Sequence, residues 1–173
     1  TFLIFFLFLF KENDPKNYLT YFKRSTVYQA MGRYRSALDD LNECLQLNPD
    51  FNPARLQKAV VLYRQGDLEQ AQKEIEYILH VDPNHLEAHQ YYQQIEHLKN
   101  DKYLVEHLVD IGKCSEAIPL LDKLSQELYW SYELRDMRAH CFESIGDIIN
   151  AINDLRALTK MKSDNTDGFL KLS

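Results

Sequence analysis

Apolar residues recur along this chain with the spacing of one face of a helix. Two such stretches occupy residues 21–45, with apolar positions at Tyr21, Val27, Tyr28 and Met31 and then at Leu38, Leu41, Cys44 and Leu45. The same pair of stretches returns at residues 56–79, with apolar positions at Leu56, Val60, Leu62 and Tyr63 and then at Leu68, Ile75, Ile78 and Leu79. A period of 3.6 residues indicates amphipathic helices, so the pattern predicts helical pairs and an all-α fold.

Three residue types repeat at an interval of 34 residues. The interval separates Gly32 from Gly66 and Gly112 from Gly146, Ala37 from Ala71 and Ala117 from Ala151, and Pro49 from Pro83. From Gly66 to Gly112 the interval is 46 residues, which is 12 more than one period. Self-similarity of this length is typical of repeat architectures, so we expect two pairs of repeats that flank an insertion.

Each repeated residue type has a physical role in such a unit. Glycine suits a short turn between two helices, because the turn favours a positive φ. Alanine lies early in the second helix, where two helices cross closely and a larger side chain would push them apart. Proline follows the second helix and cannot continue it. These three residue types therefore predict a unit that consists of a helix, a tight turn and a second helix, with the second helix ending before the proline.

A 34-residue helix–turn–helix unit with these residues resembles the tetratricopeptide repeat (TPR). The resemblance implies an all-α, right-handed superhelix of stacked units, with two TPR subdomains joined by a long helix. The expected segments are an apolar remnant at 1–15, a first subdomain at 16–83, a connecting helix at 84–111 that runs into the next repeat, a second subdomain at 98–165, and the start of a further repeat at 166–173.

The first ten residues are apolar and raise a separate question. They are too few to cross a bilayer as a helix, which takes about 20 residues. Three interpretations remain open: the hydrophobic region of a secretory signal whose start is missing, non-native sequence at a boundary, or an apolar helix that packs on the next one. Near the other end, the polar cluster at 165–167 precedes Phe169 and Leu170 and predicts the first turns of a new helix.

Composition and motifs favour binding over chemistry. A net charge of -6 disfavours nucleic acid as a partner. Cys44, Cys114 and Cys141 form neither a zinc motif nor a disulfide framework. Glycine-rich phosphate loops and nucleophile motifs are absent, and the pair His85 and His89 could gain a third metal ligand only through folding, so two surface histidines are the favoured interpretation. We therefore expect no catalytic residue, no metal, no cofactor and no stable membrane span, and we interpret the chain as non-enzymatic.

The first helices of TPR units line a concave surface, so the residues there predict what is bound. In the first two units, the candidate groove residues are Leu19, Phe22, Thr26, Leu56, Val60 and Tyr63. The later units are more polar at these positions, with Lys99, Lys102, Glu106, Glu133, Asp136 and His140. The basic clamp that holds acidic tails in some TPR proteins is absent from the first two units. We hypothesise that the groove binds extended hydrophobic peptide; the alternative is that neighbouring helices cover these residues.

Several stretches carry a more specific resemblance, at 21–32, 54–57, 116–123, 133–142 and 164–166. The chain resembles the endoplasmic-reticulum co-chaperones that combine TPRs with a J domain. The resemblance implies a lumenal protein, or a cytoplasmic one if the signal sequence is absent. It also implies binding of misfolded or unfolded proteins, delivery to the lumenal heat-shock chaperone, a part in the unfolded-protein response, and inhibition of stress kinases of translation initiation. A TPR scaffold that docks one signalling partner is the alternative function.

The chain departs from this family at three places. The His-Pro-Asp triplet of a J domain does not occur in the sequence, so the chain has no means of stimulating a partner ATPase. The family carries a cysteine near position 128 that could pair with Cys141, but Leu128 stands here, which puts that disulfide in doubt. The family's first helix–turn–helix, which contributes an apolar client-binding patch, is replaced or lost before Lys11, so we expect weakened client binding.

Overall fold

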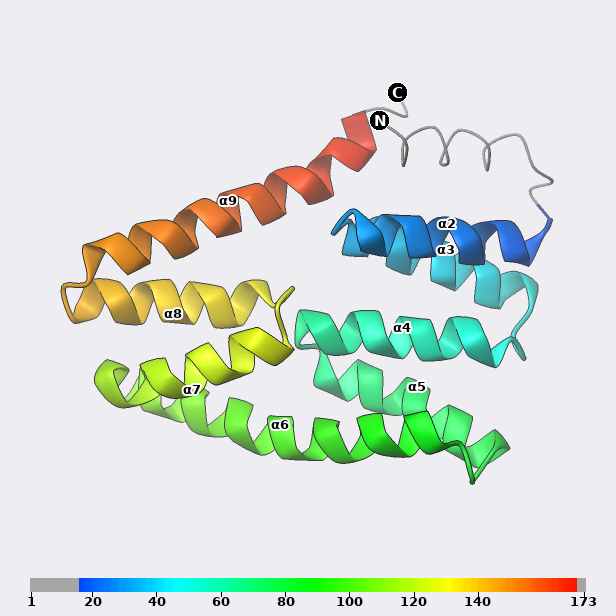
Figure 1. Ribbon diagram of the computed structural model, residues 1–173, viewed down its shortest axis with the longest axis horizontal. Helices are drawn as coiled ribbons and strands as arrows, with labels where there is room; N and C mark the ends of the chain where they lie inside the picture. Colours follow the sequence, from blue (N-terminus) through cyan, green and yellow to red (C-terminus); the bar gives the residue numbers. More distant parts are fainter. Residues whose placement is uncertain (1–15, 171–173) are drawn as a thin grey trace.

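Helices and no strand make up the part of the chain that the structure describes. The computed structural model describes residues 16–170, with side chains from 16 to 162 (Figure 1). Its helices are α2 (Tyr18–Ala30), α3 (Tyr34–Leu47), α4 (Asn52–Gln65), α5 (Leu68–Val81), α6 (Leu86–Asp110), α7 (Cys114–Glu127), α8 (Tyr132–Ser144) and α9 (Ile148–Leu170). The predicted all-α fold class is confirmed. The apolar run at 1–10 lies outside the described residues, so its three interpretations stay open.

A glycine with left-handed backbone follows the first helix of every unit. The φ angle is +71° at Gly32, +83° at Gly66, +75° at Gly112 and +82° at Gly146. A side chain at such an angle is strained, so glycine permits the turn. At Gly66 the backbone N–H donates to the Tyr63 carbonyl at 2.9 Å. The next residue, Asp67, caps α5 by accepting from the Gln70 N–H at 3.3 Å.

Small side chains allow close crossing of the paired helices. The repeated alanines are each the fourth residue of a second helix: Ala37 in α3, Ala71 in α5, Ala117 in α7 and Ala151 in α9. All four are buried, with Ala151 the most exposed at 4%. A larger residue at these positions would force the two helices apart or strain the core.

Two helices are unusually long: one between the two subdomains and one at the end of the second. The 25-residue α6 joins the two subdomains, as the insertion of 12 residues predicts. The sequence also predicted a new helix near Thr166, and there the structure differs, because the 23-residue α9 continues unbroken to Leu170. Ser163 stands where the first two units carry Pro49 and Pro83, so no proline stops this helix.

The helices form two columns that share α6 (Figure 1). The first column contains α2–α5 and the second contains α7–α9, with α6 running beneath both. One core cluster extends from α4 through α6 to α8, and a second lies among α2, α3 and α4. Met161 of α9 packs against that second cluster, so the far end of the second column touches the first column.

Candidate functional site

The six predicted groove residues occupy two neighbouring first helices. Leu19, Phe22 and Thr26 follow one another on α2, and Leu56, Val60 and Tyr63 follow one another on α4. Steps of three and four residues keep each set on one helical face. The exposed residues are Thr26 and Leu19, of which Leu19 is 37% exposed. Phe22, Leu56 and Val60 are partly buried, and together these five residues form what we call the α2/α4 face.

Aromatic and amide contacts join α2 to α4 along this face. The ring of Phe51, which precedes α4, meets Tyr18 and Phe22 edge-on at centroid distances of 5.0 and 5.1 Å. Further along, the Gln57 side-chain oxygen accepts hydrogen bonds from Gln29 at 3.1 Å and from Ser25 at 3.4 Å. These contacts join the two helices along the α2/α4 face.

Tyr63 does not belong to the accessible part of this face. Its side chain is 1% exposed, and its hydroxyl donates to the Glu127 carboxylate at 3.4 Å, across to the end of α7. Burial, followed by the nearby Glu127 charge, raises the pKa of Tyr63 to about 12. Because its surface is covered by the second column, Tyr63 offers nothing to a ligand in this structure and instead joins α4 to α7.

Both lysines at the polar positions of the later units already have partners within the protein. The Lys102 ammonium on α6 lies 2.8 Å from the Glu133 carboxylate on α8 and 3.6 Å from Glu106. The Lys99 ammonium donates to the side-chain oxygen of Gln72 at 2.9 Å. A cation that already has carboxylate partners is poorly suited to holding the acidic tail of another protein.

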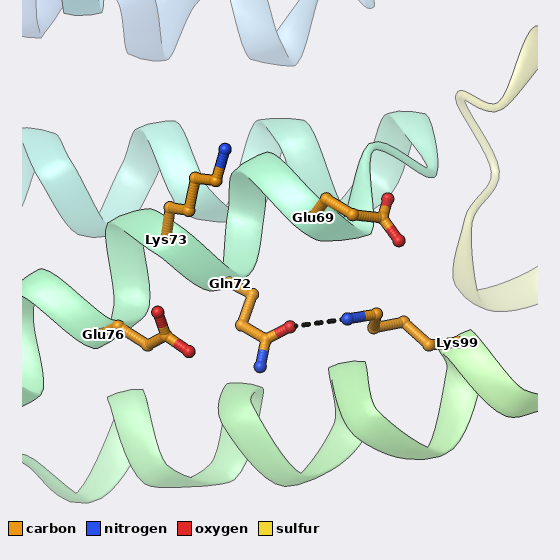
Figure 2. Close-up of a pocket in the computed structure, with 5 residues that line it drawn as sticks. All are labelled: Glu69, Gln72, Lys73, Glu76 and Lys99. Carbon is orange, nitrogen blue, oxygen red and sulfur yellow. Dashed lines mark hydrogen bonds between the residues drawn. The ribbon is translucent and has the colours of Figure 1, made fainter.

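Two surface cavities are lined partly by polar and charged side chains. One, of about 210 Å³, lies between α5 and α6 and is lined by Glu69, Gln72, Lys73, Glu76 and Lys99. Figure 2 shows that the bond from Lys99 to Gln72 crosses this cavity, with charges of both signs around it. The other, of about 290 Å³, is lined by Asp136, Ala139, His140, Glu143 and Leu155. Mixed charge and shallow shape suit neither a catalytic centre nor an apolar ligand.

A repeated ion pair within the units was missed by the sequence analysis. In three units a basic residue of the first helix meets an acidic residue 16 positions later in the second: Arg24 with Asp40, Lys58 with Glu74, and Arg138 with Asp154. The three distances are 2.6, 2.8 and 2.7 Å. At the corresponding positions the third unit, which is formed by the end of α6 and by α7, carries Leu104 and Leu120. The pair holds the two helices of a unit together and has a structural role.

The paired histidines shape the start of α6. The Nδ1 atom of His85 accepts from the Ala88 N–H at 3.2 Å and caps the helix. The Nε2 atom of His89 lies 2.8 Å from the Pro83 carbonyl. Among residues 16–162, no three His, Cys, Asp or Glu side chains gather in a way that could hold a metal ion. None of the described helices is both long and apolar enough to cross a membrane.

Comparison with known proteins identifies the fold. The tetratricopeptide-repeat family model matches residues 28–95. The crystal structure of the P58(IPK) TPR domain superimposes with a TM-score of 0.78 and 36% identity, over 90% of this chain and 44% of that one. The chain has the tetratricopeptide-repeat (TPR) fold. Its TPR units account for the regular glycines, the paired helices and the stacked columns.

Relatives of this TPR protein include J-domain proteins. DnaJ homolog subfamily C member 3 of Homo sapiens is 37% identical over 167 residues, which cover 94% of this chain and 33% of the relative. The TPR and J domain-containing co-chaperone DNJ1 of Cryptococcus neoformans is 31% identical over 178 residues, with 94% and 31% covered. The TPR protein thus spans about a third of the length of these relatives. The interpretation of this chain as non-enzymatic agrees with the name of DNJ1, which is a co-chaperone.

Proposed function

We propose that this chain is the client-binding TPR segment of a co-chaperone. The observation that carries the proposal is the similarity to DnaJ homolog subfamily C member 3, which extends over 94% of the chain. In the whole protein, a J domain would transfer misfolded or unfolded clients to the lumenal heat-shock chaperone of the endoplasmic reticulum. By the same resemblance, the whole protein acts in the unfolded-protein response and restrains stress kinases of translation initiation.

The chemistry of the α2/α4 face supports an unfolded client. Leu19 and Thr26 present uncharged surface, and Phe22, Leu56 and Val60 add apolar area beside them. A folded protein keeps such side chains inside, whereas an unfolded chain exposes them. The cations of the later units are paired with glutamates, so they do not select an acidic tail. An extended apolar segment is the ligand that matches this surface.

Binding of a permanently unfolded protein tests the proposal. Reduced, carboxymethylated α-lactalbumin is titrated into the chain, and calorimetry measures the affinity. Two variants of the α2/α4 face are compared with the parent: a double variant, Leu19→Asp with Thr26→Asp, and a single variant, Leu56→Asp. The control is Leu86→Asp, which places the same charge on a residue that is 80% exposed at the start of α6. We expect both face variants to weaken binding roughly fivefold or more, since a charge in an apolar contact costs at least about 1 kcal/mol.

Two results contradict the proposal. Equal affinity for the parent, the face variants and the control would show that the α2/α4 face does not bind clients. Capture of one folded partner, without affinity for unfolded protein, would favour the scaffold alternative. Circular dichroism of every variant separates a lost binding surface from a lost fold.

A further inference from the structure

Two of the three cysteines meet at one end of the second column. Cys114 is the first residue of α7, and Cys141 lies in the last turn of α8. The two helices are consecutive and pack against each other, which brings the start of one to the end of the next. Cys114 is 5% exposed and Cys141 is 0% exposed, and both belong to the same core cluster. Cys44 lies in the other cluster, among the helices of the first column.

The two thiols lie close enough to interact. Burial first, and the neighbouring Cys114 thiol second, raise the pKa of Cys141 to about 12. In the structure described here all three cysteines are free thiols. A disulfide would join the two sulfurs at a bond length of about 2.05 Å.

From this placement we infer that Cys114 and Cys141 form a disulfide bond when the protein folds under oxidising conditions. The bond would connect the start of α7 to the end of α8, the two points of this helical pair farthest from the loop that joins them. It would therefore close the pair at its open end, where helix contacts alone now hold it. Cys44 has no cysteine near it in the described residues and would remain a thiol.

The chemistry balances with a small-molecule disulfide such as oxidised glutathione. A cysteine thiolate attacks one glutathione sulfur, forms a mixed disulfide and releases one glutathione thiolate. The second cysteine thiolate then attacks the protein sulfur and releases the other glutathione. The two cysteines lose two electrons and two protons, and one oxidised glutathione becomes two reduced molecules. Because both thiols are buried in the folded state, we expect reaction during folding, after α7 and α8 come together but before the core excludes glutathione.

Peptide mapping of the refolded full chain tests the inference directly. The chain is refolded in a buffer of reduced and oxidised glutathione, alkylated, and digested without reduction. We expect a crosslinked peptide containing Cys114 and Cys141, and one alkylated cysteine, Cys44. Cys44→Ser should keep the crosslink, whereas Cys114→Ser and Cys141→Ser should each leave two alkylated cysteines. Three alkylated cysteines in the parent, or a crosslink that includes Cys44, would overturn the inference.

A thermal measurement adds a second readout on the same samples. Reduction of the crosslinked parent should lower the melting midpoint by roughly 5–10 °C, since the bond restricts the unfolded chain. Cys114→Ser should melt at one temperature with and without reductant. A parent midpoint that reductant does not move would contradict a crosslink that constrains this helical pair. Neither experiment involves a client, so failure here leaves the proposed function untouched.

Discussion

Arg24 holds Asp40 with two hydrogen bonds, at 2.7 Å from Nε and 2.6 Å from Nη2. Asp40 is only 4% exposed, and a buried carboxylate is costly unless a cation and hydrogen bonds compensate it. The planar guanidinium provides both at once. The third unit replaces the pair with two leucines, Leu104 and Leu120, which indicates that apolar residues are compatible with the same positions.

We predict that breaking the pair is far worse than replacing it. Arg24→Leu leaves Asp40 buried without its main partner and should lower the free energy of unfolding by about 2–3 kcal/mol, less than for a fully buried pair because Arg24 is partly exposed. Arg24→Leu with Asp40→Leu reproduces the third unit's residues and should recover most of this loss. Urea denaturation measures both, with Arg35→Leu on the exposed side of α3 as control. A double variant no better than the single one would refute charge compensation.

These pairs were present in the sequence but not recognised there. Arg24 and Lys58 are 34 residues apart, as are Asp40 and Glu74. Charged residues are frequent on helix surfaces, so their spacing alone does not separate a buried pair from two solvated side chains. Glycine and alanine are more informative, because their presence reflects backbone angle and close packing rather than solubility.

At the scale of the elements, the turn after α4 is more crowded than the other turns. A Cβ atom added to Gly66 would lie 2.9 Å from the Ser131 hydroxyl oxygen, whereas one added to Gly32 would meet no atom within 4 Å. Ser131 caps α8 by accepting from the Leu134 N–H at 3.3 Å. The turn of the first column and the cap of a helix in the second column therefore share one space.

We predict different costs for the same substitution at two glycines. Gly32→Ala should lower the free energy of unfolding by about 1 kcal/mol, because alanine is strained at positive φ. Gly66→Ala causes the same strain and also displaces Ser131 from its capping position on α8. It should therefore lower the free energy of unfolding by about 1 kcal/mol more than Gly32→Ala does. Urea denaturation gives both values. Equal losses would show that Ser131 moves aside without cost.

The helices themselves follow from local pattern, with one exception. Glycine, alanine and proline at fixed spacing place the turns, crossings and stops without knowledge of the tertiary fold. For α9 the polar cluster at 165–167 resembled a helix start, yet the helix runs through it. Polar residues cap a helix only where the backbone leaves the helical conformation, and they otherwise lie on its surface. Because position 163 is not a proline, no residue before the cluster forces the backbone to leave the helical conformation.

At the scale of the whole molecule, the loop between α7 and α8 joins the two columns. Trp130 stacks on Tyr34 of α3 with ring centroids 6.0 Å apart. Its backbone N–H donates to the Arg64 carbonyl at the end of α4 at 2.9 Å. In return, Arg64 donates to the Glu127 carbonyl at 2.9 Å. These residues are distant in sequence, and the way in which two columns meet is not encoded in helical periodicity, so the contact could not be predicted.

We predict that Trp130→Ala separates the columns without melting their helices. The substitution removes the stacked ring but keeps the backbone, and should cost about 2 kcal/mol, less than a fully buried tryptophan. Small-angle X-ray scattering should show a larger radius of gyration, and hydrogen exchange should rise near Tyr34 while far-ultraviolet circular dichroism stays unchanged. Tyr103→Ala, at a residue 75% exposed on α6, should change none of these. An unchanged radius of gyration for Trp130→Ala would contradict the prediction.

Trp130 is also the only tryptophan in the chain. The protein thus contains a single natural indole fluorophore, and it lies at the contact between the two columns. Its emission wavelength depends on how much water reaches the ring, so the colour of the emitted light follows the separation of the columns rather than the melting of one helix. Any separation of the columns in an unlabelled sample would therefore appear as a red shift of the Trp130 emission.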